Sequence, residues 1–130
     1  MFTEEETLLQ DARLAVALAC FNAGDWYGAH DHFEELWHET QGPIRPALQG
    51  VLQIAVAHVH LERGNLHGAT VLLGEGIGRL AHVEPDALGL DMVTLRRLAG
   101  EQLQCLQRGL PLDSCSPLRL SPAPSDPSFH

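Results

Sequence analysis

The fold is decided by two stretches forty residues apart, "FNAGDWYGAHDHFEELW" at Phe21–Trp37 and "LERGNLHGATVLLGEGI" at Leu61–Ile77. In each copy a glycine is followed by Asp or Asn, and a small Gly-Ala pair follows shortly after. Glycine adopts the left-handed backbone that ends a helix, and Asp or Asn caps the next one. Each copy therefore predicts a helix, a tight turn and an antiparallel helix. The aligned positions are Gly24 and Gly64, Asp25 and Asn65, Gly28 and Gly68, Ala29 and Ala69, and Glu35 and Glu75.

Apolar residues recur at helical spacing along the whole body of the chain. Thr3 and Glu6 form a capping-box pattern, which predicts one helix from about Glu4 to Asn22. Four more helices are expected at about 25–40, 43–64, 65–83 and 91–106. No segment alternates with the period of a strand. The expected fold class is all-α, an antiparallel bundle of about five helices built from two αα-hairpins plus a C-terminal helix.

Length and composition predict one folded domain. A chain of 130 residues can bury a real core. We expect residues 1–109 to form the helical bundle and residues 110–130, rich in proline and serine, to form a disordered tail. No apolar run approaches the roughly 18 residues that span a bilayer, and the acidic N-terminus does not resemble a signal peptide. These features predict a cytoplasmic protein without membrane contact.

Charge and missing residue types exclude several function classes. The net charge is −9, and the first 40 residues hold nine acids and one base, which repels nucleic-acid backbones and favours a basic partner or a cation. There is no lysine, which excludes Schiff-base chemistry and a P-loop lysine. Every serine lies at or beyond Ser114, so the folded body holds no serine nucleophile. Cys20, Cys105 and Cys115 are widely spaced and are interpreted as reduced thiols.

A polar cluster is predicted between the helices expected at 25–40 and 43–64. Successive helical residues rotate by about 100°, which places His30, Glu34 and Trp37 at the rim of the buried face of the first of these helices. The next helix is apolar around most of its circumference but carries a polar stripe. That stripe contains Arg45, Gln49, Gln53, His60 and Arg63. The predicted cluster consists of His30, Glu34, Gln53 and His60, walled by Trp37. The full set of candidate pocket residues is His30, Asp31, Glu34, Trp37, Gln49, Gln53, His60 and Arg63.

Two interpretations of this cluster stay open. His30 and Glu34, spaced i and i+4, form a plausible set of ligands for a divalent metal together with His60. A hydrogen-bonded network that fixes the helix register accounts for the same residues and is favoured, because no complete HExxH motif is present. No cofactor is predicted, and no residue is assigned a catalytic role. His58 is interpreted as a satisfied or surface histidine, and the glycines of "GEGIG" (74–78) as sites of close helix packing.

The chain resembles a known family at four motifs. These are Asn-x-Gly at Asn22, Ala-His-Asp-x-x-Glu-x-x-Trp at 29–37, Gln-Gly-x-x-Gln at 49–53, and His-x-x-Arg-Gly-Asn-x-x-Gly-Ala at 60–69. They resemble domain-of-unknown-function family 309, the TTHA-type small helical-bundle proteins of bacteria and archaea, over about 14–106. Asp31 departs from the glutamate usual there, and "GEGIG" replaces a better helix former. The resemblance implies a small all-α fold and no established activity.

Two functions are therefore hypothesised. The first is a binding or assembly module, whose partner is another protein or a second copy of the chain. Its support is the repeated hairpin architecture and the lack of lysine and serine in catalytic settings. The alternative is a metal-dependent hydrolase-type enzyme, in which His30, Glu34 and His60 hold the metal or transfer protons.

Overall fold

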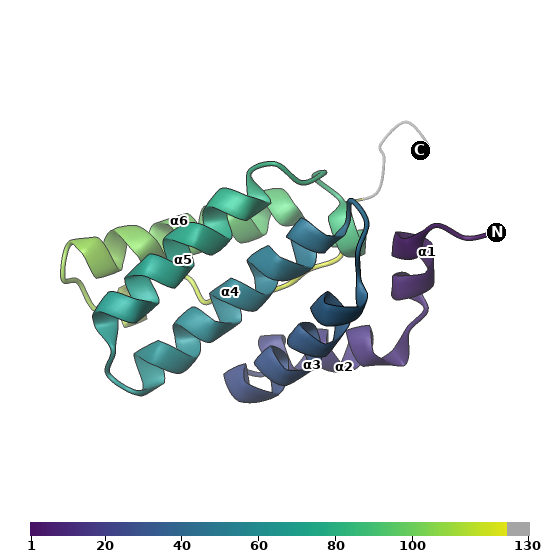
Figure 1. The fold of residues 1–130 in the computed structure, drawn as a ribbon. Helices are drawn as coiled ribbons and strands as arrows, with labels where there is room; N and C mark the ends of the chain where they lie inside the picture. The colour runs from purple at the N-terminus through teal and green to yellow at the C-terminus, as the bar shows by residue number, and fades with distance from the viewer. Residues whose placement is uncertain (125–130) are drawn as a thin grey trace.

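The computed structural model describes residues 1–124, which form a helical bundle with no strand in this range (Figure 1). An isolated antiparallel bridge pairs Leu90 with Pro122. The all-α prediction is thus confirmed. The elements in chain order are α1 (Glu4–Leu9), α2 (Ala12–Asn22), α3 (Trp26–Glu39), α4 (Arg45–Glu62), α5 (Leu66–Leu80), the 3-10 turn η1 (Ala87–Gly89), α6 (Met92–Gln107) and the 3-10 turn η2 (Leu112–Ser114).

The two hairpins, α2–α3 and α4–α5, are built in the same way. Gly24 and Gly64 have φ values of 77° and 75°, in the left-handed region that ends the first helix of each hairpin. Asp25 and Asn65 then cap α3 and α5, each accepting a backbone N–H three residues ahead at 3.0 Å. Each residue from 27 to 40 is buried, half-buried or exposed like the residue forty positions later. The sequence repeat is therefore also a structural repeat.

The helix expected at Glu4–Asn22 is interrupted. α1 ends at Leu9, and the Asp11 carboxylate accepts the backbone N–H of Arg13 at 2.9 Å, which starts α2 as a new helix. An aspartate at this position favours a cap over a continuous helix, because its side chain competes with the helical backbone bonds. The two short helices therefore point in different directions (Figure 1).

The helices pack in series, with α4 in the middle. α2 packs on α3, α3 on α4, α4 on α5, and α5 on α6. α4 and α5 are in close contact at Gly50 and Gly76, where a Cβ on Gly76 would lie 2.9 Å from the Gly50 carbonyl oxygen. A Cβ on Gly78 would meet nothing within 4 Å. Close packing thus explains Gly76 but not every glycine of "GEGIG".

The C-terminal segment differs from the disordered tail expected from its composition. Residues 110–124, which we call the strap, pack on the bundle, and Leu118 and Leu120 are 7% and 5% exposed within its core. Arg119 between them is exposed, so the strap alternates like a half-buried strand. The average composition of residues 110–130, dominated by proline and serine, does not reveal this short alternation. Figure 1 shows the strap in yellow, passing behind α4 and α5; the remaining tail, 125–130, lies outside the described residues.

None of the described helices is long and apolar enough to cross a membrane.

Candidate functional site

Within residues 1–124, His30 has all its polar contacts on its own helix, α3. Its Nε2 lies 2.6 Å from a carboxylate oxygen of Glu34, and its Nδ1 lies 3.1 Å from Asp31. The second oxygen of Glu34 lies 3.5 Å from Nε2 of His38, one turn further along α3. The α3 half of the predicted cluster is therefore a row along one helix, and the structure gives it no bond to Gln53 or His60 on α4.

The α4 half of the predicted cluster faces away from α3. Gln53 donates to the Glu75 carboxylate at 3.1 Å and accepts from Nε of Arg79 at 2.9 Å, both on α5. His60 pairs instead with the side chain of Asn65 at 3.1 Å, in the turn that follows α4. The reason is the central position of α4. α4 has α3 on one side and α5 on the other. A polar stripe about 80° wide on α4 therefore reaches from the side near α3 to the side near α5, and its residues find different partners.

The remaining predicted residues form stacking contacts or line α4. The Arg45 guanidinium lies 4.2 Å above the Trp37 ring, which joins the start of α4 to the end of α3 by a cation–π contact. Arg63 lies 5.1 Å from the Tyr27 ring centre. Gln49 is half-buried on α4. The indole N–H of Trp37 is buried and has no acceptor among residues 1–124. Trp37 thus belongs to the α3–α4 contact rather than to the wall of a shared pocket.

The proposed metal ligands do not converge in the described part of the chain. Residues 1–124 contain no group of three His, Cys, Asp or Glu side chains arranged to hold an ion. His30 and Glu34 pair on α3, whereas His60 pairs at the α4–α5 turn.

Replacing Glu34 tests this description of the row. Because Glu34 pairs with histidines one turn away on a partly exposed helix face, Glu34→Ala is expected to lower the free energy of unfolding by only about 0.5 kcal/mol or less. The effects of Glu34→Ala and His60→Ala should add, whereas Glu34→Ala and His30→Ala should couple. Urea unfolding of the single and double variants measures both. A strong coupling between Glu34→Ala and His60→Ala would contradict this arrangement and indicate a cluster that joins α3 to α4.

A buried polar pair joins α4 to α6, and sequence reasoning did not find it. His58 and Gln102 are 7% and 6% exposed, and their side chains meet at 2.9 Å. The His58 ring also stacks on Trp26, with centroids 4.2 Å apart. The interpretation of His58 as a satisfied histidine agrees with this arrangement. Its partner lies 44 residues away in the sequence, so no local spacing reveals the pair.

The protonation of His58 fixes the orientation of Gln102. Burial lowers the pKa of His58 below its ordinary value, so the neutral ring is favoured. Nδ1 donates to the Ile54 carbonyl oxygen at 2.9 Å, which leaves Nε2 as an acceptor. Oε1 of Gln102 lies 2.9 Å from Nε2, so a neutral ring with its proton on Nδ1 requires the Gln102 amide to be flipped, with its NH₂ group toward Nε2. Both polar side chains are then satisfied inside the core.

A cavity of about 550 Å³ lies beside this pair, between the bundle and the strap. Its bundle side comes from the end of α2, the α2–α3 turn, α3, α4 and α6, and its other side comes from the strap. The lining includes Asn22, Trp26, His58, Gln102, Asp113, Cys115 and Leu118. This is the place where side chains from four separated segments of the chain converge.

Asn22 at the end of α2 holds the strap by its backbone. The Asn22 side-chain NH₂ donates to the Leu120 carbonyl oxygen at 2.9 Å, and its oxygen accepts the Leu120 backbone N–H at 2.7 Å. Two backbone bonds continue the contact, from Asp91 N–H to the Ser121 oxygen at 2.8 Å and from Ala123 N–H to the Gly89 oxygen at 2.9 Å. We call the surface formed by Asn22, the 89–91 backbone and the core around Leu118 and Leu120 the strap seat.

The cysteines differ from the expectation of three reduced thiols. Cys105 on α6 and Cys115 on the strap are joined in a disulfide, whereas Cys20 is free and half-buried. Burial raises the pKa of the Cys20 thiol, and the nearby Asp25 carboxylate raises it further. The fold brings Cys105 and Cys115 together because the chain reverses after α6, and residue spacing alone did not predict that reversal.

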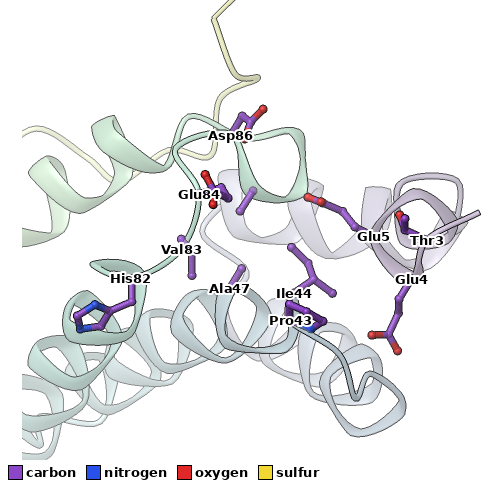
Figure 2. A pocket seen from close by; sticks show the side chains of 11 residues that line it. Thr3, Glu4, Glu5, Pro43, Ile44, Ala47, His82, Val83, Glu84 and Asp86 are labelled. Carbon is purple, nitrogen blue, oxygen red and sulfur yellow. The ribbon is translucent and has the colours of Figure 1, made fainter.

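A second cavity, of about 470 Å³, lies beneath α1 (Figure 2). Figure 2 shows Glu4 and Glu5 on one side of it and Glu84 and Asp86 on the other. Two of these acids already serve the fold. Glu4 accepts the N–H of Gly42 at 2.7 Å, and Glu5 accepts the N–H of Leu88 at 2.8 Å, which fastens α1 to the bundle.

Most of the acidic side chains in the first 40 residues have partners within the chain. Arg13 alone contacts Asp11, Glu35 and Glu39 at 2.7–2.8 Å. These three carboxylates raise the pKa of the Arg13 guanidinium above its usual range, so this group stays charged. Asp31 and Glu34 contact His30, and Glu4 and Glu5 accept backbone N–H groups. The charge of this region therefore does not by itself specify a basic partner.

The comparisons with known proteins bear on the segment that holds Asn22. Residues 14–72 match the family described as "Domain of unknown function (DUF309)". A search of the curated proteins found no match. The matched segment runs from Leu14 in α2 through α3 and α4 to the first half of α5, and it includes both repeated turns and Asn22 of the strap seat. The family resemblance predicted from the motifs is thus confirmed over residues 14–72.

Proposed function

We propose that this protein is a binding module that takes an extended protein segment in the strap seat. The observation that carries the proposal is the Asn22 side chain, which holds both backbone groups of Leu120. Such a contact recognises an extended chain independently of its side chains. Recognition by main-chain bonds, with alternate side chains in apolar pockets, is an established mode of peptide binding. The strap then occupies the seat as an intramolecular ligand that competes with the partner segment.

The side chains of the strap indicate what the partner segment must carry. Leu118 and Leu120 are buried in the core, and the intervening Arg119 is exposed. The proposed ligand is therefore an extended segment with two apolar residues separated by one residue of any kind. Asn22 lies within the family match at 14–72, whereas the strap lies beyond it. The recognising residue thus lies in the segment that matches the family, and the strap lies outside that segment.

A variant with an unoccupied seat tests the proposal. We define the open variant as Leu118→Ser with Leu120→Ser, and the strap peptide as a labelled peptide with the sequence of 116–124. Fluorescence polarisation should show binding of the strap peptide to the open variant and at least about tenfold weaker binding to the wild type, because the tethered strap competes at high effective concentration. Adding Asn22→Leu should weaken binding at least about fivefold, since two hydrogen bonds are lost.

Controls make the result specific to the seat. A strap peptide with serine at both leucine positions should not bind, and circular dichroism must show that the open variant keeps its helices. If it does not fold, the wild type provides a second assay. Saturation with an Arg119→Gln strap peptide should displace the strap and accelerate tryptic cleavage after Arg119. A folded open variant that fails to bind the strap peptide would contradict the proposal. Mixed dimers of wild type and open variant would identify a second copy as the occupant.

A further inference from the structure

We propose that Cys105 and Cys115 form a reversible disulfide that latches the strap over its seat, so that small thiols control access of an extended partner segment. This inference rests on the proposed function, because it concerns regulation of the same seat. It assigns a covalent role to two cysteines that the binding proposal does not use.

The turn between α6 and the strap places the two cysteines next to each other, in addition to the disulfide that joins them. Cys105 lies in the last turns of α6 and is 8% exposed, and Cys115 directly follows η2. Between them the chain turns at Gly109, whose φ is 67°. Backbone bonds from Leu110 N–H to the Cys105 oxygen and from Cys115 N–H to the Leu112 oxygen, both 2.9 Å, shape this turn. Reduced Cys105 and Cys115 would therefore meet again whenever the strap lies in its seat, so the bond can re-form.

Of the two bonded cysteines, only Cys115 borders the cavity of about 550 Å³ between the bundle and the strap. A small thiolate entering this cavity attacks the Cys115 sulfur, and the bond to the Cys105 sulfur breaks. Cys105 leaves as a thiolate and takes up a proton. A second thiol then attacks the mixed disulfide, so that two thiols are oxidised to one small disulfide and both cysteines become thiols.

Reduction lengthens the tether that holds the strap. In the disulfide state the nearest covalent anchor is Cys115, three residues before Leu118. After reduction the anchor is Gln107 at the end of α6, eleven residues before Leu118. Effective concentration falls roughly with the 3/2 power of tether length, so the strap should occupy its seat about sevenfold less strongly when reduced.

The third cysteine is a poor competitor in this exchange. Cys20 is half-buried, and burial raises the pKa of its thiol, which lowers the thiolate fraction. It is also absent from the lining of the cavity. A Cys20→Ser background therefore simplifies thiol counting without touching the latch.

The experiment uses the full chain with Cys20→Ser, oxidised by glutathione disulfide or reduced by dithiothreitol. Mass spectrometry should find no free thiol in the oxidised monomer and two in the reduced one. Polarisation should show the strap peptide binding about sevenfold more tightly after reduction. The matched control, Cys20→Ser with Cys115→Ser, should bind equally under both conditions, with the affinity of the reduced protein.

Two results would overturn the latch. The first is a monomer in which both thiols stay free after treatment with glutathione disulfide. The second is a disulfide that forms but changes neither the affinity for the strap peptide nor the rate of tryptic cleavage after Arg119. The cleavage assay needs no partner, and the latch predicts faster cleavage after reduction. If the open variant does not bind the strap peptide, the proposed function fails, while cleavage still decides whether the disulfide restrains the strap.

Discussion

Gly76→Val is expected to lower the free energy of unfolding by about 3 kcal/mol, near the upper end of the usual cost of overpacking a core. A Cβ at this position would lie 2.9 Å from the Gly50 carbonyl oxygen and 2.9 Å from a side-chain carbon of Ile54. The first of these neighbours is backbone on α4, so only a shift of the whole helix can relieve the clash. Urea unfolding monitored by circular dichroism measures the loss.

Gly78→Ala on the same helix is the matched control. Nothing lies within 4 Å of the added Cβ, and alanine is the better helix former by about 1 kcal/mol. This variant should be as stable as the wild type or more so. Equal stabilities of Gly76→Val and the wild type would mean that α4 and α5 are not in close contact.

The buried pair of His58 and Gln102 gives the second large effect. Replacing either residue by leucine leaves the other without its partner inside the core, which is expected to cost about 1–3 kcal/mol of unfolding free energy. The double variant should lose less than the sum of the two single variants, because no orphaned group remains. Gln104→Leu, at an exposed position on α6, is the control and should change stability by about 0.5 kcal/mol or less.

The same pair predicts a pH dependence. The pKa of His58 is lowered in the folded protein, so the unfolded chain takes up the proton first as the pH falls. The contribution of neutral His58 to the free energy of unfolding is therefore complete above its ordinary pKa of 6.5. It is lost progressively as the pH falls from there toward the lower pKa of the folded state. Unfolding curves between pH 7.5 and about 5 should show a loss in the wild type that is smaller in His58→Leu. Equal slopes would contradict a buried neutral ring.

The hairpins could be predicted because their signals are local. Gly24 with Asp25, and Gly64 with Asn65, each specify a helix end and the next helix start within two residues. The interruption before α2 was missed although Asp11 is itself a cap residue. Apolar positions at helical spacing continue on both sides of it, and periodicity does not reveal a change of direction.

The polar contacts were harder to predict because they depend on packing. Helical rotation placed Gln53 and His60 on one stripe, but it did not decide that Gln53 faces α5. The pairing of His58 with Gln102, and of Asn22 with Leu120, joins residues 44 and 98 positions apart. Such contacts carry no spacing signal, so a single sequence does not contain them in readable form.

The strap shows why average composition misled. Its prolines and serines are typical of disorder, yet Leu118 and Leu120 supply a two-residue apolar pattern that the bundle buries. Nuclear magnetic resonance of the labelled open variant with the strap peptide tests the seat most directly. The account predicts that the Asn22 side-chain NH₂ signals shift and show intermolecular contacts with the peptide backbone at the second leucine. Binding elsewhere on the surface, with the Asn22 signals unchanged, would contradict it.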